Sequence, residues 1–542
     1  MRRRPFAAAL LWFAAISALA APLAAQQPVS STVAFSQRSI EIDSYLQRGQ
    51  ELEGQRRWGE AVAHYEEGLR QFPEADTLEK RFELARLHFD LGRRYADRSF
   101  AERLSQMPAE KALDLYQQVL LKIENHYVEQ PAWKNLVDRG TADLQTALAE
   151  PVFLERNLPG ASPAAVDAFR RELSETLAQR NVANRSDARD SVVIAANLAQ
   201  QRLGLSSTIV ILEYLCGATN SLDPYSAFLT PDQLGEVYSQ IDGSFVGLGV
   251  ELKAQGGQLT IVRVISGSPA EQAGVRPGDC IHAVDGRLAS RYTTDQAANL
   301  LQGAEGTVCA LVLAAPGEAD RQVAVRRQRV EVPSVDRIHI VDPQQGVAYL
   351  RLTCFQKTTR RDLEAALWRL HRDGMRSLII DLRGNPGGLL ISSVDVSDLF
   401  IDQGVIVSTH GRMSQEDSTY TAHEKGTWRV PLTLIIDQES ASAAEIFSGA
   451  IRDHHRGTIV GTRSFGKGSV QGIFQLDGTD SGLRLTTAKF YSPTGKPYSR
   501  VGVEPDVVVH RAAKPINGVL ADKDDAMLAT ALQIAQKAAM PK

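Results

Sequence analysis

Two residues, Ser442 and Lys467, have the types and surroundings that hydrolytic chemistry needs. Residues 432–437, LTLIID, form an apolar run rich in branched side chains, which predicts a strand buried on both faces. Residues 441–453 carry alanines and spaced apolar side chains, which predicts a helix packed on that strand. Ser442 therefore falls where a buried strand turns into a helix, and the free N–H groups of the helix start can stabilise an oxyanion beside its hydroxyl.

Lys467 lies between Gly466 and Gly468, a few residues before Gln471. A lysine between two glycines has little side-chain cover of its own, so the rest of the fold could wall it off from water. Burial lowers the pKa of an ammonium group, and a neutral lysine can act as a general base. Taken singly, each feature has a plainer explanation, because a serine before a helix is usually an N-cap and a GKG tripeptide is usually a turn.

The segments SASAAEI and TRSFGKGSVQ, found in this order, resemble the carboxyl-terminal processing peptidases, which are tail-specific serine endopeptidases with a PDZ domain. The resemblance implies that Ser442 is the nucleophile, that Lys467 is its base and that Gln471 supports the lysine. The chain departs from the usual SASASEI pattern at Ala444, so an auxiliary role for a third serine does not transfer.

A second motif of the same family, DLRGNPGG, occupies residues 381–388. The resemblance implies that the N–H groups of Gly388 and Ala443 form the oxyanion hole. It also implies a crotonase-like spiral α/β core and a reaction that needs no metal or organic cofactor. The fold class expected is therefore a multidomain α/β protein built around that core.

Residues 243–330 resemble a PDZ domain inserted in the peptidase unit, because FVGLGVEL, SPAEQAG and PGD follow one another in order. Consecutive N–H groups of its glycine-rich loop can hold a peptide's terminal carboxylate, and the strand after the loop can pair with the peptide. Residues 294–301 are expected to form the helix that walls the groove. The predicted substrate-binding residues are Phe245, Val246, Gly247, Leu248, Gly249 and Val250.

Residues 1–25 have the three parts of a secretory signal: arginines, an apolar run and an alanine-rich end. Cleavage is expected after Ala20 or Ala25, and the alternative is an uncleaved anchor. The expected location is the periplasm or cell envelope, with an extracellular location open, and without stable membrane insertion once the signal is removed.

Residues 26–114 are expected to be a helical region that resembles tetratricopeptide repeats. It is either a structural extension or a surface for an adaptor or regulator. Residues 115–242 resemble the helical start of the peptidase unit, with SLDPYS at 221–226 and a helical insertion at 149–205 whose purpose is not legible. In the tetratricopeptide-like region, the positions that the repeat prefers are occupied by Tyr45, Gly49, Ala61, Tyr65 and Pro73.

Residues 331–510 are expected to form the peptidase core, with 333–341 as a link. Strands alternate with helices in this region, which predicts a largely parallel sheet covered on both faces. Residues 511–542 are expected to be a surface tail with one helix near 525–538.

The 60 Lys and Arg residues nearly balance 64 Asp and Glu, and no basic block is present, so no nucleic-acid partner is expected. The four cysteines lie among apolar neighbours without metal-site spacing, so they are expected to be buried and free. A disulfide between two of them, Cys280 and Cys309, is the alternative. The full set is Cys216, Cys280, Cys309 and Cys354.

The function expected is that of a serine endopeptidase acting on proteins near their carboxyl terminus, with free protein or peptide tails as partners and a homo-oligomer left open. One alternative is an inactive PDZ and helical-repeat adaptor, against which intact Ser442, Lys467 and Gln471 argue. The other is a Ser/His/Asp esterase using His454 or His455, against which the lack of a Gly-x-Ser-x-Gly elbow argues.

Overall fold

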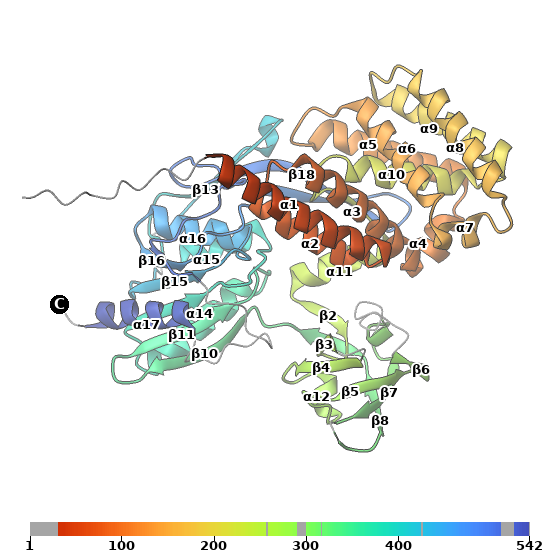
Figure 1. Ribbon diagram of the computed structural model, residues 1–542. Coiled ribbons are helices and arrows are strands. Elements are labelled where there is room, and N and C mark those ends of the chain that lie inside the picture. Colours follow the sequence, from red (N-terminus) through yellow and green to blue (C-terminus); the bar gives the residue numbers. More distant parts are fainter. Residues whose placement is uncertain are drawn as a thin grey trace, which may run out of the picture. The chain divides into compact units, whose positions relative to one another are not determined.

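The computed structural model describes residues 31–255, 258–289, 300–315, 317–423, 427–510 and 525–540 (Figure 1). The predicted signal, residues 1–25, and most of the predicted PDZ helix, residues 294–299, lie outside these ranges. The chain divides into two compact units, Met1–Leu91 and Gly92–Lys542. None of the helices in the described ranges combines the length and the apolar character that crossing a membrane requires.

The first unit is helical, as expected. Its core gathers apolar side chains from neighbouring helices, with Ala61 and Tyr65 fully buried. Gly49 lets the helices approach closely, because a Cβ there would lie 2.1 Å from the Tyr65 ring. The Tyr65 hydroxyl donates to the Glu53 carboxylate at 2.7 Å. The helices are α1 (Ser31–Gly54), α2 (Trp58–Gln71) and α3 (Asp76–Ala96).

The second unit begins with a helical bundle centred on α10 (Ser207–Asn220). Every residue of Thr208–Thr219 is buried, because the sequence is apolar on all sides of the helix. The expected insertion at 149–205 is helical and contributes α7, α8 and α9. The surrounding elements are α4 (Arg98–Glu102), η1 (Leu104–Gln106), α5 (Ala109–His126), α6 (Trp133–Ala147), α7 (Pro151–Asn157), α8 (Pro163–Ala178), α9 (Arg185–Leu203), β1 (Ala227–Leu229) and α11 (Pro231–Asp242).

The segment predicted as a PDZ domain forms a sheet in the order β3-β4-β5-β7-β8, entered and left through the paired strands β2 and β9. All four cysteines are free, but only Cys216 and Cys309 are buried, so the expectation of burial was wrong for Cys280 and Cys354. Cys280 pairs with Ala314, several residues along β7 from Cys309, so a disulfide between the two cysteines is excluded. The elements are β2 (Ser244–Gly247), β3 (Val250–Gln255), β4 (Gln258–Val264), α12 (Pro269–Gln272), β5 (Cys280–Val284), β6 (Arg287–Leu288), β7 (Val308–Ala314), β8 (Arg321–Arg326) and β9 (Gln328–Glu331).

The segment predicted as the peptidase core contains a sheet in the order β10-β11-β12-β15-β16-β19, parallel from β11 onward. The expectation of a link at 333–341 was wrong, because β10 occupies these residues and pairs antiparallel with β11. A bulge after Asp336 breaks the alternation of apolar residues that marks a strand. The strands are β10 (Val335–Asp342), β11 (Val347–Leu352), β12 (Ser377–Asp381), β15 (Leu432–Ile436), β16 (Gly457–Gly461) and β19 (Val507–Val508).

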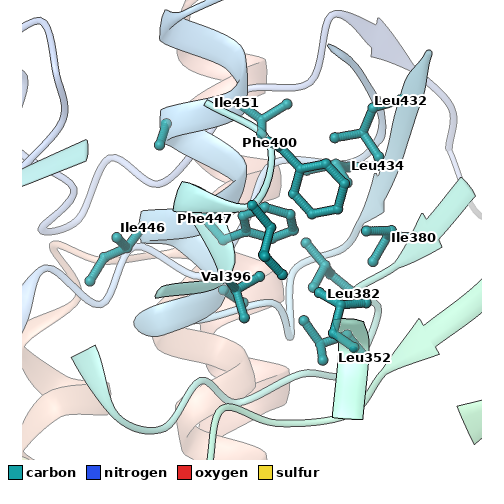
Figure 2. Close-up of a cluster of buried hydrophobic side chains, with 14 of the residues drawn as sticks. Leu352, Ile380, Leu382, Val396, Phe400, Leu432, Leu434, Ile446, Phe447 and Ile451 are labelled. Carbon is teal, nitrogen blue, oxygen red and sulfur yellow. The ribbon is translucent and has the colours of Figure 1, made fainter. Parts of the chain in front are cut away.

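The central strands are apolar throughout because both of their faces are covered. Ile380 and Leu434 point into a cluster with Phe447 (Figure 2). Their neighbours Ile379 and Ile435 point to the opposite face. The helices packed with the first cluster are α14 (Thr359–Arg372), α15 (Leu390–Asp398) and α16 (Ala443–Asp453).

The helix α17 (Ala526–Ala539) covers the opposite face of this sheet with Met527, Ala531 and Ala535, which are buried. The predicted helix near 525–538 is therefore present, but the expectation that it belongs to a surface tail was wrong. Its buried face consists mostly of alanines, so its sequence has only a weak amphipathic pattern.

A second sheet brings together segments far apart in the chain. Its longest strand, β18 (Gly482–Tyr491), pairs with β17 along Gly482–Lys489, with β1 along Gly482–Arg484, and with β13 along Ala488–Tyr491. β18 thus links β17, which follows Lys467, to β1, which follows the SLDPYS segment. The remaining elements are β13 (Val405–Gly411), η3 (Ser414–Glu416), β14 (Ser418–Thr421) and β17 (Ser469–Gln475).

Candidate active site

Ser442 stands at the sharp turn between β15 and α16. Its backbone has φ of 56° and ψ of −115°, a conformation that is strained for a residue with a side chain. The turn is tied to the DLRGNPGG segment, because Ser440 Oγ donates to the Leu382 carbonyl at 2.9 Å and Ala441 N donates to the Asn385 carbonyl at 2.9 Å. Ser442 is half-buried. The strained turn presents a serine at the edge of the sheet, as predicted for a nucleophile.

Glu445, one turn into α16, joins the serine turn to the lysine loop. Its carboxylate is fully buried. Oε2 accepts hydrogen bonds from the N–H groups of Ser442 at 2.8 Å and Lys467 at 2.9 Å. Oε1 accepts from Ser464 Oγ at 2.5 Å and Gly466 N at 2.7 Å. Burial raises the pKa of the Glu445 carboxyl, and the four hydrogen bonds oppose that rise.

Lys467 is half-buried, and its environment disfavours the ammonium form. Burial, and after it the positive charge of Arg484, lowers the pKa of Lys467 to about 8. The carboxylates of Glu445 and Asp223 act in the opposite direction. The Lys467 Nζ atom lies 4.6 Å from the centroid of the Tyr225 ring. A substantial fraction of the lysine is therefore neutral near pH 8, which a general base requires.

Gln471 lies on β17 opposite Thr486. Its side-chain Nε2 donates to the carbonyl of Ser469 at 3.1 Å and to Ser469 Oγ at 2.9 Å. These hydrogen bonds fasten the strand immediately after the lysine. In this structure the amide is thus engaged with Ser469, while the contact of Lys467 Nζ is with Tyr225.

The DLRGNPGG loop passes directly beside the Ser442 turn. A Cβ at Gly387 would lie 2.7 Å from the Cβ of Ser442, so the two segments are in contact. Gly388 is exposed, has φ of 140°, and forms an isolated bridge with Phe355. Among the described residues, the N–H groups of Gly388 and Ala443 have no acceptor. Two free donors therefore flank Ser442, as an oxyanion site requires.

The base of this loop is fixed by a buried ion network. Arg383 contacts Asp381 at 2.5 Å and Asp525 at 2.7 Å, and the Tyr349 hydroxyl donates to Asp381 at 2.9 Å. Asp437 accepts from Gly384 N at 3.0 Å. Asp381 and Asp437 thus hold the loop at the carboxyl edge of the parallel strands.

His454 and His455 are at the other end of α16 from Ser442. His454 is the C-terminal cap of the helix, and its Nε2 lies 2.7 Å from the Val405 carbonyl. A helix of this length separates its ends by roughly 16 Å. Neither histidine can therefore act as the base for Ser442, which removes the Ser/His/Asp alternative.

The predicted peptide-binding residues lie on β2, on β3 and in the loop between them. The carbonyls of Leu248 and Gly249 accept hydrogen bonds from Ala270 and Ile265, and Leu248 is buried in the domain core. β3 is an end strand of the described sheet. Of the predicted helix at 294–301, only Leu300 and Leu301 fall within the described residues, and both are helical.

Sequence reasoning missed two residues that the structure brings to the site. Glu445 follows Ser442 by three positions, which is the spacing of a capping box, so this signal was available. Tyr225 lies in the SLDPYS segment, but nothing local relates it to Lys467, because only the pairing of β1 and β17 with β18 brings the two together. No group of three or more His, Cys, Asp or Glu side chains suited to a metal ion occurs in the part of the chain that the structure describes.

Comparisons with known proteins identify the family of the chain. A sequence profile of Peptidase family S41 matches residues 346–509, and a PDZ domain profile matches residues 260–314. The carboxy-terminal-processing protease of Bartonella bacilliformis is 36% identical over 302 residues, which are 54% of this chain and 68% of that protein. The carboxyl-terminal-processing protease of Synechocystis sp. is 35% identical over 294 residues, which are 53% of this chain and 68% of that protein.

Among solved structures, the photosystem II D1 C-terminal processing protease aligns with a TM-score of 0.40 at 24% identity, covering 77% of this chain and 99% of that chain. The sequence profiles define a serine-type peptidase that carries a PDZ domain. On the identity to the two relatives, the chain belongs to the carboxyl-terminal-processing proteases of peptidase family S41.

Proposed function

We propose that Ser442 and Lys467 are the nucleophile and the general base of an endopeptidase that cleaves protein substrates near their carboxyl terminus. The observation that carries this proposal is the shared acceptor Glu445, to which both residues donate their main-chain N–H groups. The distance between the two main-chain nitrogens therefore cannot exceed the sum of their distances to Glu445 Oε2. Long side chains such as lysine readily reach a serine hydroxyl across such a separation.

The reaction proceeds through an acyl-enzyme. Neutral Lys467 Nζ takes the proton of Ser442 Oγ while the oxygen attacks the peptide carbonyl carbon. The resulting ammonium gives its proton to the leaving amine as the peptide bond breaks. Water then attacks the ester on Ser442, Lys467 takes a proton from that water, and the released serine regains a hydrogen. No step needs a metal ion or organic cofactor.

The N–H groups of Gly388 and Ala443 receive the oxyanion. One such donor contributes roughly 3 to 4 kcal/mol in serine proteases. Free donors on both sides of the strained Ser442 turn support this assignment. Gln471 supports the lysine indirectly, because its amide fastens Ser469, two residues along the same loop.

The PDZ domain takes the substrate's free carboxyl terminus. The terminal carboxylate meets the loop formed by Phe245, Val246, Gly247, Leu248, Gly249 and Val250, and the peptide pairs with β3, an end strand of its sheet. The segment that precedes the tail is then laid along the active site. A substrate whose terminal carboxylate is amidated should therefore be cleaved more slowly, with the change mainly in KM.

The finer features of the fold belong to the same proposal. The core is of the crotonase-like spiral type, and the two-helix packing at Gly49 and Tyr65 supports a tetratricopeptide-like repeat. The domain boundaries are 1–25, 26–114, 115–242, 243–330, 331–510 and 511–542. The final boundary encloses a helix that packs on the core sheet.

Residues 1–25 direct the chain to the periplasm or cell envelope and are then removed. The composition of this segment supports export. The N-terminal helical region offers a surface for an adaptor or regulator, and assembly into a homo-oligomer belongs to the proposal as well. Sequencing the amino terminus of the protein recovered from cell fractions, together with its mass in solution, tests these points.

The deciding experiment measures hydrolysis of an unfolded protein with an apolar carboxyl terminus. The parent chain is compared with Ser442→Ala and Lys467→Ala, and His454→Ala serves as the control. We expect cleavage by the parent and the histidine variant and none by the other two. Cleavage by Ser442→Ala, or its loss in His454→Ala with the fold intact, would overturn the dyad.

A further inference from the structure

The side chain of Lys467 reaches across to an aromatic ring from a distant part of the chain. Its Nζ lies 4.6 Å from the centroid of the Tyr225 ring, within the range of a cation–π contact. Tyr225 is half-buried, so the contact lies partly away from water. The ring thus contacts Lys467 Nζ, the atom that gains a proton when Ser442 attacks in the proposed reaction.

Tyr225 is held in this place by a dense set of hydrogen bonds. Its N–H donates to Asp223 Oδ1 at 2.7 Å, and its carbonyl accepts from Arg484 Nε at 2.8 Å. The next residue, Ser226, donates from its hydroxyl to Asp223 Oδ2 at 2.7 Å and accepts from Thr486 N at 3.1 Å. The backbone that carries the ring is therefore fixed to β18.

The same strand fixes the lysine. Gln471, on the strand that follows Lys467, lies opposite Thr486, the residue whose N–H holds Ser226. β18 thus supports the lysine loop on one edge and the tyrosine turn on the other. The segments that carry the Tyr225 ring and the Lys467 amine are therefore both attached to β18.

We propose that Tyr225 is a positioning residue of the catalytic base, whose ring face orients Lys467 and stabilises the ammonium that forms during proton transfer. This inference rests on the proposed function. A neutral amine gains little from the ring, whereas the ammonium is attracted to it, so the contact strengthens as the reaction proceeds.

The charged groups around the Lys467 amine do not by themselves position it. Arg484 on β18 repels an ammonium at this position, and Glu445 on α16 and Asp223 before β1 attract it. The Glu445 carboxylate is already engaged by four donors, and Asp223 by the turn that it holds. The ring supplies the close contact at Nζ that these carboxylates do not.

The first test compares Tyr225→Leu with Tyr225→Phe, which keeps the ring face. For Tyr225→Leu, kcat/KM above the acid limb should fall about 5- to 30-fold, and the midpoint of the acid limb should move about 0.5 to 1.5 pH units lower. KM should change little, and Tyr225→Phe should stay within about twofold of the parent. An unmoved or higher midpoint, or an equal loss in both variants, would overturn the proposal.

A second test keeps the shape of the side chain constant. Phenylalanines with one, two and three ring fluorines at position 225 remove electron density from the ring face step by step. The logarithm of kcat/KM should fall steadily along the series. A flat series would contradict an electrostatic role for the ring, even if the Tyr225→Leu chain failed to fold.

A third readout does not depend on hydrolysis. In a Ser442→Ala background, the ε-nitrogen of Lys467 is titrated by 15N NMR and assigned from its loss in Lys467→Ala. Tyr225→Leu should lower the measured pKa of Lys467, and an equal or higher value overturns the proposal. An inert parent enzyme would count against the proposed function, while this titration would still decide the role of the ring.

Discussion

Ser442 and Lys467 donate their main-chain N–H groups to the same atom, Oε2 of Glu445, at 2.8 and 2.9 Å. One fully buried carboxylate therefore sets the spacing between the Ser442 turn and the Lys467 loop. Its other oxygen ties Ser464 and Gly466 to the same point. The geometry of the site consequently depends on a residue that takes no part in the bond changes.

Glu445→Gln tests this dependence. An amide has one oxygen and one NH2 group, so in either orientation the NH2 would leave at least one main-chain N–H donor without its acceptor. We expect a loss of about 2 to 4 kcal/mol in the free energy of unfolding and at least about a 100-fold fall in kcat. Denaturant unfolding and steady-state hydrolysis measure the two quantities. The matched control is Glu439→Gln, an exposed carboxylate in the same turn, which should leave both nearly unchanged.

The pKa of Lys467, about 8, predicts the pH dependence of hydrolysis. Only the neutral amine can accept the serine proton, so kcat/KM should rise about tenfold per pH unit below pH 7, pass its midpoint near pH 8 and level above it. A substrate without groups that titrate in this range is required. A midpoint near pH 6.5, the ordinary value of histidine, would contradict the assignment of the base.

The lowered pKa of Lys467 should also reduce the stability of the folded chain at neutral pH. A free lysine has a pKa of about 10.4, so between pH 8 and that value the unfolded chain binds more protons and stability rises with pH. Lys467→Met removes this penalty and should stabilise the fold at pH 7 by about 1 to 2 kcal/mol. Denaturant midpoints at pH 7 and above pH 10.5 measure the effect. A gain of the same size at both pH values would argue against a lowered lysine pKa.

Gly387→Ala tests the contact between the DLRGNPGG loop and the Ser442 turn. A Cβ at this position would lie 2.7 Å from both the Ser442 Cβ and the Ala441 carbonyl oxygen. Gly374→Ala is the matched control, since Gly374 has a similar φ of 92° but nothing within 4 Å of its Cβ. Both variants should lose about 1 to 2 kcal/mol from the positive φ. Only Gly387→Ala should lose kcat, by about 100-fold, and equal activity in the two variants would refute the contact.

Asp525→Asn tests the anchor of α17. Arg383 holds Asp381 and Asp525 together, and the three side chains are largely buried, so loss of one carboxylate leaves an imperfectly paired charge. We expect a loss of about 2 to 4 kcal/mol. The control is Asp402→Asn, whose partner Arg429 is exposed, with an expected loss below about 1 kcal/mol. Similar losses at the two sites would show that the network adds no stability.

Local patterns were enough to predict the elements that carry the site. Residues 432–437 and 441–453 have the compositions of a buried strand and of the helix packed on it, and β15 and α16 lie there within two residues. The depressed pKa of Lys467 was anticipated only as a consequence of burial. Its actual causes, burial and Arg484, depend on strands that pair across the fold.

Other features had no local signal or a misleading one. β10 contains a bulge, so its apolar residues do not alternate, and the segment was interpreted as a link. The inner face of α17 is made of alanine and methionine, so its sequence does not mark it as the helix that covers Ile379 and Ile435. Tyr225 reaches Lys467 through two strand pairings, which a one-dimensional pattern does not encode.

The partnership of Arg383 with Asp525 spans 142 positions of the chain. During synthesis, the loop that carries Gly388 emerges long before the carboxylate that anchors its base. Contacts of such long sequence separation form late in folding. The base of this loop therefore lacks one of its two carboxylate partners until residue 525 has been synthesised.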